Sequence, residues 1–567
     1  MKRNILFITL LLAVCSAVQG KVQIRRNQVG NYPGQEHVIV VEGVNPSGKM
    51  RVTTPDGRVL KPKVVRKAVS PWSKKARYIV DLGDLADIGN YHVSVGGEVC
   101  DLVVDEHPYS AIATSSLRLF YLIRSGVPID QAGVYNRPAG HPDNMVMVHP
   151  SAASTLRPAG TIISSPYGWY DAGDYNKYVV NSAFSMGLIF AVYEQLPDYF
   201  ARLKTDIPES HNATPDVLDE MMFNLRWLIT MQDPFDGGVY HKLTTPNFES
   251  FVLPKDCRQP RFVVQKSVTA TLDFAAVMAD AARLFEPFGQ DYPGFSALAA
   301  AMAERAYLWA KANPTAFYHQ EQLKDPAITT GTYGDNRARD EFFWAATALY
   351  RLTGKQQYLD DARQYQPEAF TTPTWGNVAS LGAFEWLAFG DKSALYETML
   401  QQLVAYCEAS VKDVDKSCFQ SPYGNKAADF GWGCLAEFCC CQAVALLYAD
   451  RLTEESYRRF AFENADYLSG RNATGYCFVT GFGDQSPMHP HHRISEADGI
   501  EAPFPGMLVG GPNPGQQDKS DMPVPYVSNY PDESYMDVMQ SYASNEIAIN
   551  WNASLVAFLC WLDALRP

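Results

Sequence analysis

Residues 535–553 read YMDVMQSYASNEIAINWNA and place the carboxyl group of Glu546 among Tyr, Ile, Ala and Trp residues. Ile547, Ile549 and Trp551 follow it closely, and the segment has the composition of a buried helix. A carboxyl surrounded by apolar side chains loses its hydration, so its neutral form is favoured and its pKa should rise. We therefore expect Glu546 to hold a proton near neutral pH. The alternative is a buried carboxylate that pairs with an arginine or caps a backbone group.

A second acidic stretch, GWYDAGDY at residues 168–175, precedes an amphipathic segment. Asp171 and Asp174 could simply cap a helix, since aspartate is common at helix N-termini and Gly173 suits a turn. The functional alternative is that both carboxylates hold one water molecule, which one of them deprotonates while the other orients it. A protonated acid and an ionised base in different surroundings are what acid–base hydrolysis of a glycosidic bond requires.

Three histidines and an arginine lie together in HPHHR, residues 489–493. Pro490 and the loop setting disrupt the i, i+4 spacing of helical metal sites, so metal binding is not the favoured interpretation. We expect hydrogen bonds to sugar hydroxyls instead, with Arg493 pairing a carboxylate.

Together these segments resemble glycoside hydrolase family 9, which includes inverting cellulases with an N-terminal immunoglobulin-like domain. Residues 169–174 are similar to the family's catalytic-base element, and Pro490–Arg493 resembles a second signature, from which Cys477 and Gln485 depart. Residues 535–553 fit the acid-bearing signature at every defined position, namely Tyr535, Asp537, Tyr542, Glu546, Ala548, Asn552 and Ala553. The resemblance extends over residues 21–567.

The resemblance implies a multi-domain chain, with an N-terminal immunoglobulin-like β-sandwich followed by an all-α (α/α)6 barrel. The expected parts are a signal peptide at 1–20, the sandwich at 21–106 and the (α/α)6 glycoside hydrolase catalytic domain at 107–567. Local patterns permit this, because short β-rich runs alternate with turn signals up to residue 106 and about twelve amphipathic segments follow. The last of these begins near Ser541, which would place Glu546 in a helix.

Long segments rich in Gly, Pro and aromatic residues separate these helices. They cover residues 127–173, 233–264 and 470–535. Loops of such length in a compact domain suggest binding or catalysis, so we expect them to gather on one face and line a groove.

The resemblance also assigns roles to single residues. Asp174 would be the general base, Asp171 its partner in holding water, and Glu546 the general acid. Inversion needs room for that water, so the base and acid carboxyls should lie about 6.5–9.5 Å apart. Asp537 would support the acid region. The substrate-binding candidates are His491, Arg493, Tyr170, His241, Trp375, Trp432 and Tyr542, with Tyr526 as a further sugar platform; each of these aromatics could instead be part of the core.

Charge and targeting signals restrict the partners. The net charge of the chain is −14, and residues 107–567 alone carry −19 because the first 106 residues are mildly basic. An acidic surface repels phosphate backbones, so no nucleic-acid partner is expected. Met1-Lys2-Arg3 and the short apolar run that follows predict a signal peptide, cleaved after Gly20, and a periplasmic or secreted protein. Alternatively, Cys15 ends an approximate lipoprotein box and would anchor the chain to an outer membrane. No transmembrane segment is expected, and we expect a monomer.

The expected chemistry requires no cofactor. A structural calcium ion could bind Asp216, Asp219 and Glu220, although favourable charge at a helix N-terminus explains these residues equally well. Some relatives carry zinc near a loop with Cys and His, but here residues 137–141 read RPAGH, with Gly140 where that cysteine would stand, which argues against zinc. Cys439–Cys441 lie in an apolar helical stretch, so buried free thiols are favoured over disulfides or metal ligands.

The sequence thus predicts an exported hydrolase that cleaves β-1,4-glucosidic bonds of cellulose, mixed-linkage glucan or xyloglucan by an inverting endo mechanism. The alternative within the family is an exo-acting β-glucosidase or exo-β-glucosaminidase on short oligosaccharides. Endo and exo action depend on how the ends of the groove are closed, which local sequence does not reveal. A glycan-binding protein without turnover is disfavoured by the three carboxyls, and a lyase by the lack of a basic cluster.

Overall fold

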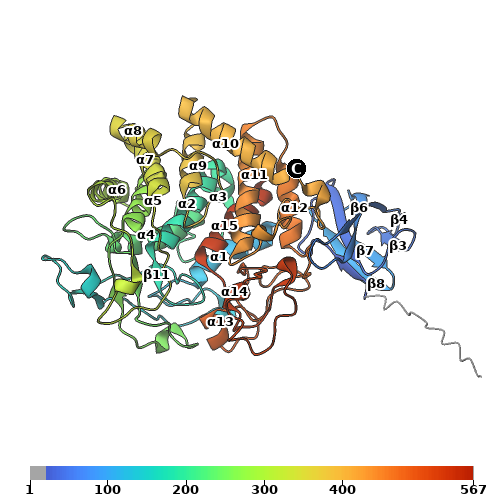
Figure 1. The fold of residues 1–567 in the computed structure, drawn as a ribbon, viewed down its shortest axis with the longest axis horizontal. Coiled ribbons are helices and arrows are strands. Elements are labelled where there is room, and N and C mark those ends of the chain that lie inside the picture. Colours follow the sequence, from blue (N-terminus) through green and yellow to red (C-terminus); the bar gives the residue numbers. More distant parts are fainter. Residues whose placement is uncertain (1–20, 566–567) are drawn as a thin grey trace, which may run out of the picture.

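The computed structural model describes residues 21–565 and has an N-terminal β-sandwich beside a larger helical part (Figure 1). The predicted signal peptide and Cys15 lie outside the described residues. The sandwich has two antiparallel four-stranded sheets, of order β1-β2-β6-β5 and β4-β3-β7-β8. The strands are β1 Gln23–Arg25, β2 Glu36–Glu42, β3 Met50–Thr53, β4 Val59–Leu60, β5 Lys63–Val69, β6 Ala76–Asp84, β7 Gly89–Val95 and β8 Glu98–Val104.

Strand β2 explains how the sandwich meets the helices. Its sequence EHVIVVE contains the continuous apolar run VIVV at residues 38–41, which is typical of a strand that is buried on both faces. Ile39 and Val41 point into the core between the two sheets. Val38 and Val40 point the other way and join the core of the helical part. The two parts therefore share buried apolar surface.

The helical part contains helices that differ in how completely they are buried. Nearly all residues of α2 and α15 are buried, as expected for helices that are hydrophobic around their whole circumference. The helices are α1 Ser110–Leu122, α2 Val179–Gln195, α3 Pro197–Arg202, α4 Asp216–Met231, α5 Val268–Leu284, α6 Phe295–Ala312, α7 Arg339–Thr353, α8 Gln356–Tyr365, α9 Ala379–Phe389, α10 Ala394–Val411, α11 Cys441–Leu452, α12 Arg458–Leu468, α13 Arg493–Ala497, α14 Tyr542–Asn545 and α15 Ile549–Ala564. A π-helix, Leu435–Cys440, leads into α11.

The long loops contain more regular structure than predicted. Five short strands form a sheet of order β10-β9-β13-β12-β11, with β9 Val146–Val148, β10 Ile162–Ile163, β11 Lys177–Tyr178, β12 Lys242–Thr244 and β13 Phe262–Val263. This sheet joins the loop 127–173 to the loop 233–264 through backbone hydrogen bonds. The two loops are therefore held in fixed positions relative to each other.

The segment around Glu546 is not one helix, which corrects the expectation from its composition. Helix α14 ends at Asn545, residues 546–548 are extended, and α15 begins at Ile549. The extended residues form isolated bridges, pairing Glu546 with His491, Ile547 with Val509 and Ala548 with Ala172. Hydrogen bonds to distant segments thus replace the helical ones that the local sequence favours.

Two further expectations from the sequence can be compared with the structure. Cys439–Cys441 are buried and free, as predicted, and no disulfide forms among residues 21–565. None of the helices within those residues has both the length and the apolar character needed to cross a bilayer.

Candidate active site

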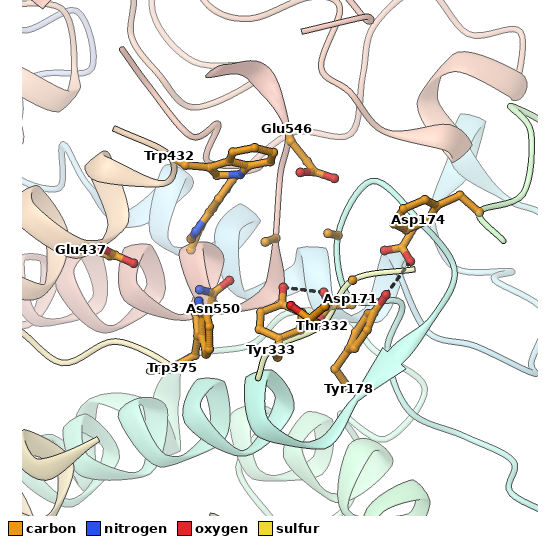
Figure 2. Close-up of a pocket in the computed structure, with 15 residues that line it drawn as sticks. Asp171, Asp174, Tyr178, Thr332, Tyr333, Trp375, Trp432, Glu437, Glu546 and Asn550 are labelled. Carbon is orange, nitrogen blue, oxygen red and sulfur yellow. Dashed lines mark hydrogen bonds between the residues drawn. The ribbon is translucent and has the colours of Figure 1, made fainter. Parts of the chain in front are cut away.

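A cavity of about 580 Å³ lies in the helical part, and it contains all three carboxyls singled out from the sequence. Figure 2 shows Asp171, Asp174 and Glu546 toward one end of this cavity and Trp375, Trp432, Glu437 and Asn550 toward the other. The remaining lining includes Tyr178, Phe248, Thr332, Tyr333 and Trp551.

Backbone hydrogen bonds bring the two acidic segments together, although they are far apart in the chain. Ala172 forms an isolated bridge with Ala548, and the amide of Ile549 donates to the carbonyl of Asp171 at 2.8 Å. A third segment joins them, because the amide of His491 donates to the carbonyl of Asn545 at 2.9 Å. The relative positions of the carboxyls are therefore set by main-chain contacts.

Asp171 is buried and held by two donors. Its Oδ1 accepts from Asn181 Nδ2 at 2.7 Å and its Oδ2 from Tyr333 Oη at 2.7 Å. Burial raises the pKa of Asp171 to about 8, with a further contribution from the neighbouring charge of Asp174, and these effects outweigh the two hydrogen bonds. The paired carboxyls therefore do not both ionise readily at neutral pH.

Asp174 is also buried, and its contacts converge on one oxygen. Its Oδ2 accepts from the amide of Asn176 at 3.3 Å and from Tyr178 Oη at 3.3 Å, and the side-chain amide of Asn176 also donates to it. These donors stabilise a negative charge on Asp174. The surroundings of Asp171 and Asp174 are thus polar but buried.

Glu546 is half-buried, and its pKa is raised well above the ordinary value. Burial is the main cause, the negative charges of Asp174 and Asp171 add to it, and Arg493 opposes it. The carboxyl of Glu546 packs against Gly173, where a Cβ would come within 3.1 Å of its Oε1. Glu546 therefore keeps its proton as the pH rises toward neutrality, as Asp171 does.

The HPHHR loop lies against both acidic segments. His491 Nδ1 lies 2.7 Å from the carbonyl of Met539 and donates to it, and burial lowers the pKa of His491 to about 4, so the ring is neutral. Arg493 donates from Nε to the carbonyl of Glu249 and from Nη1 to that of Gly173, both at 2.8 Å. No carboxylate within residues 21–565 forms an ion pair with Arg493, which corrects the expected pairing. Arg493 instead fixes the backbone beside Asp174.

The predicted aromatic contacts fall into two groups. Trp375 and Trp432 line the cavity, and Trp432 is 43% exposed. Tyr542 is half-buried, and the centroid of its ring lies 5.7 Å from that of Trp432. Its hydroxyl donates to Asp521. Tyr526 donates to Asp518 at 2.8 Å. Of the predicted aromatic contacts, Trp375 and Trp432 are therefore the ones that line the cavity.

The structure does not bring Tyr170 and His241 to the cavity. Tyr170 is buried, with its hydroxyl 3.1 Å from His141 Nδ1. His241 is fully buried, stacks on Tyr318 at 3.9 Å, and has both ring nitrogens hydrogen-bonded, one of them to the carbonyl of Thr332 at 2.7 Å. Both rings are enclosed by protein, which corrects the expectation that they contact a sugar directly.

Asp537 contacts the residues beside the segment that carries Glu546. Its carboxylate accepts from the amides of Met488 and His489, each at 2.9 Å, and from Asn545 Nδ2 at 3.2 Å. It thus connects the loop before HPHHR to the residue that precedes Glu546.

Several cavity residues carried no sequence signal. Tyr333 belongs to none of the predicted motifs, yet its hydroxyl binds Asp171, and its φ of 44° is rare outside glycine. Glu437 has its pKa raised to about 7 by burial, and the buried Oδ1 of Asn550 has no protein partner. An unusual backbone angle and an unpaired buried oxygen are marks of functional sites, but both appear only in the folded chain.

The calcium candidates do not converge on a common point. Asp216 accepts from the amide of Thr205 at 2.7 Å and from Ser210 Oγ at 2.6 Å. Glu220 pairs with Arg124 at 2.9 Å, and Asp219 accepts from Asn212 at 2.9 Å. Each carboxylate thus has protein donors, while the buried Oδ2 of Asp219 has no hydrogen-bond partner.

The zinc arrangement of relatives does not fit residues 137–141. A Cβ at Gly140 would lie 2.3 Å from the carbonyl carbon of Pro254, so a cysteine could not occupy that position without moving the backbone. This agrees with the prediction that the loop does not hold zinc in that way.

The fold and the cavity agree with the comparisons to known proteins. A model of glycosyl hydrolase family 9 matches residues 109–559, and the chain belongs to this family and is a glycoside hydrolase. Hydrolysis by paired carboxyls needs no cofactor.

Three relatives illustrate how close the similarity is. The chain is 51% identical to the xyloglucan-specific endo-β-1,4-glucanase BoGH9A of Bacteroides ovatus, over 96% of this chain and 94% of that protein. It is 30% identical to endoglucanase D of Acetivibrio thermocellus, over 94% and 82% of the two chains. A solved structure described as Bacteroides ovatus GH9 matches with a TM-score of 0.92 at 50% identity, covering 96% of this chain and 99% of that one.

Proposed function

We propose that the protein is an inverting endo-β-1,4-glucanase that acts on a β-glucan of the xyloglucan type. The observation that carries this proposal is the convergence of Asp171, Asp174 and Glu546 in one cavity that also exposes Trp375 and Trp432. A carboxyl that keeps its proton and a carboxylate held by donors, in one cavity, support acid–base cleavage of a glycosidic bond.

In the proposed mechanism Glu546 is the general acid. Its raised pKa keeps it protonated, and it gives that proton to the glycosidic oxygen as the bond to the anomeric carbon breaks. A water molecule held by Asp171 and Asp174 attacks the anomeric carbon from the opposite face, and Asp174 takes its proton. The product is the α-anomer, and the acid and base carboxyls should be about 6.5–9.5 Å apart.

Asp171 would orient the water molecule without taking its proton. Tyr333 and Asn181 hold its carboxyl in place, and its raised pKa leaves the negative charge of the pair on Asp174. His491 and Arg493 would position the base segment and the sugar beside it, and Asp537 would support the segment that carries Glu546.

The far end of the cavity would bind the glucan backbone. Trp432 and Trp375 offer apolar faces for pyranose rings, and Glu437 and Asn550 offer polar atoms between them. Substrate of the xyloglucan type is supported by the 51% identity to a xyloglucan-specific enzyme over nearly the whole chain.

We extend the proposal to the architecture and location. The residues from 107 onward would form an (α/α)6 barrel, and residues 21–106 an immunoglobulin-like sandwich that packs on it. The first 20 residues would direct export to the periplasm, the medium or, through Cys15, an outer membrane. The enzyme would act as a monomer.

Proton NMR of xyloglucan and cellohexaose digestion over time tests the proposal. We expect early α-anomeric products of several sugar lengths, formed faster from xyloglucan. Early β-anomers would contradict inversion. Glucose or single end units released one at a time would contradict endo action and favour the exo-acting alternative, and no turnover of either substrate would contradict the proposed substrate class.

A further inference from the structure

A second group of reactive side chains lies outside the catalytic cavity. His141, Glu249 and Cys257 each present a ligand atom, and these three atoms lie within 4.8 Å of one another. Among residues 21–565 they are the group of histidine, cysteine and acidic side chains whose atoms could hold one metal ion. None of them was predicted to bind a metal. They line or adjoin a separate cavity of about 370 Å³.

The imidazole of His141 has one nitrogen free to bind a metal ion and the other held by the protein. The side chain is only 9% exposed, and its Nε2 is buried without a hydrogen-bond partner. Its Nδ1 lies 3.1 Å from Tyr170 Oη, and that hydroxyl donates to the carbonyl of Gly140 at 3.4 Å. With the hydroxyl proton used in this way, Nδ1–H donates to Tyr170 Oη, and the lone pair of the ring lies on Nε2. An unpaired buried nitrogen costs free energy unless something binds it. The backbone at His141 has φ of 50°, a conformation uncommon for a residue with a side chain.

The other two groups complete a donor set of nitrogen, sulfur and oxygen. Glu249 and Cys257 are half-buried, and Glu249 Oε1 accepts from the amide of Gln259 at 3.2 Å. Calcium and magnesium prefer oxygen donors alone, whereas zinc binds histidine, cysteine and carboxylate together. Ligands of a tetrahedral zinc ion lie roughly 3.3–3.8 Å apart, so a closure of about 1 Å would complete the site. One thiolate and one carboxylate would neutralise the charge of Zn²⁺.

Nearby cations do not occupy these ligands. Arg261 donates to both oxygens of Asp143, at 3.0 and 3.2 Å, and Lys177 pairs with the same carboxylate at 2.7 Å. Asp143 is therefore saturated by protein donors, and among residues 21–565 neither His141 nor Glu249 forms an ion pair.

We propose that His141, Glu249 and Cys257 bind one zinc ion, with water at the fourth position, and that this ion fastens the loop around residue 250 to the loop around residue 140. The site differs from the zinc arrangement of relatives, since Gly140 supplies no ligand and its close packing on Pro254 leaves no room for one.

The fastened loop forms part of the wall of the catalytic cavity. Phe248 lines that cavity, and Phe251 packs edge-on against His491 at 5.3 Å. The carbonyl of Glu249 accepts from Arg493, whose guanidinium also lies over both phenyl rings. Zinc would thus hold the cavity wall in place without contacting the reacting atoms.

The test uses the full chain after removal of metals by a chelator. We expect one equivalent of Zn²⁺ to bind in competition with a chromophoric zinc chelator, and to raise the Tm. Co²⁺ in its place should give the charge-transfer absorption of a cobalt–thiolate bond. Cys257→Ser should abolish that absorption and weaken zinc binding at least about 10-fold, and Glu249→Gln should also weaken it. Cys100→Ser, which alters a half-buried thiol in the sandwich, is the matched control.

A further variant tests the hydrogen bond behind the ligand. Tyr170→Phe removes the group that fixes His141, and outer partners of this kind change metal affinity about 10- to 100-fold. The proposal is overturned if the native chain binds no equivalent of zinc, or if Cys257→Ser and Glu249→Gln bind zinc as the native chain does. These readouts do not depend on hydrolysis, so they remain distinct from a failure of the proposed activity.

Discussion

At the scale of single residues, the cavity separates three carboxyls by their surroundings. Glu546 is raised in pKa by burial and by two negative neighbours, whereas Asp174 is held by three donors. Asp171 lies between these cases, with donors on both oxygens and a pKa of about 8. Differences of this kind allow one site to offer a proton and accept another at the same pH.

The proposed roles of acid and base predict different responses to the leaving group. Glu546→Gln and Asp174→Asn should each lower kcat on glucan by about 10²- to 10⁴-fold, because each removes one proton transfer. On an aryl β-glucoside whose phenol leaves without protonation, Glu546→Gln should regain most of its rate and Asp174→Asn should not. Steady-state kinetics on both substrates check this. Equal recovery in the two variants would contradict the assignment, and the circular dichroism of each variant controls for folding.

The same roles predict the pH dependence of the rate. Glu546 must be protonated to act, so kcat should fall as the pH rises through its raised pKa. On the activated glycoside, Glu546→Gln should lose this alkaline limb and keep the acid limb. An alkaline limb that persists in this variant would show that another group causes it.

The buried carboxyl of Asp171 predicts a pH-dependent stability. The pKa of Asp171 is about 8 in the folded chain, and its ordinary value, which applies to the unfolded chain, is 3.8. Between these two pH values the folded chain keeps a proton that the unfolded chain releases. Its contribution to stability is therefore fully present below about pH 4 and is lost as the pH rises toward 8. Asp171→Asn should raise the Tm at pH 7 relative to the native chain, and the difference should vanish near pH 4.

Calorimetry at pH 4, 5.5 and 7 measures this difference, with the exposed Glu501→Gln as control. A Tm gap for Asp171→Asn that does not change with pH would contradict a titrating origin.

At the scale of elements, short backbone bridges hold the cavity together. Gly173 is the closest point, since a Cβ there would lie 2.2 Å from the carbonyl oxygen of His491. The residue must be glycine because the HPHHR loop, the base segment and Glu546 all meet at this position.

Gly173→Ala should therefore separate Asp174 from Glu546. We expect kcat to fall about 10²-fold, since a shift of about 1 Å in a catalytic group has this effect. Gly376→Ala is the matched control, because a Cβ at Gly376 meets no atom within 4 Å. Kinetics and Tm of both variants provide the measurement, and native activity in Gly173→Ala would show that the backbone adapts without cost.

At the scale of the whole molecule, a buried ion pair connects the sandwich to the segment that leads into the catalytic region. Arg77 on β6 is fully buried and donates to Glu42 and to Asp532, each at 3.1 Å, and it lies 4.2 Å from the ring of Phe419. Asp532 precedes the signature that carries Glu546 by a few residues. The sandwich is therefore bonded to the segment that leads into residues 535–553.

Arg77→Met should lower the free energy of unfolding by about 3–5 kcal/mol, because it leaves buried carboxylates without a partner. Arg77→Met combined with Asp532→Asn should recover part of this loss. Urea unfolding followed by fluorescence measures both, and the exposed Lys61→Met should remain near the native value. A loss below about 1 kcal/mol in Arg77→Met would contradict a stabilising role of the pair.

Local patterns in the sequence were sufficient to predict most helices and strands, and they singled out Asp171, Asp174 and Glu546. Helices follow residue 106, as the amphipathic segments predicted, because amphipathic spacing acts within one or two turns. The apolar neighbours of Glu546 correctly indicated a raised pKa. These features depend on contacts between residues close in the chain, or on average burial, and both can be estimated from composition.

The sequence by itself thus determined which segments supply the three carboxyls that line the cavity. Only the tertiary structure decided that Glu546 is extended, that Tyr333 binds Asp171, and that His141 meets Glu249 and Cys257. The physical reason is that each of these outcomes depends on pairing between segments far apart in the chain. By itself, the same local sequence could form its backbone hydrogen bonds as a helix or as a loop. Pairing with a distant segment decides which conformation it adopts in the folded chain.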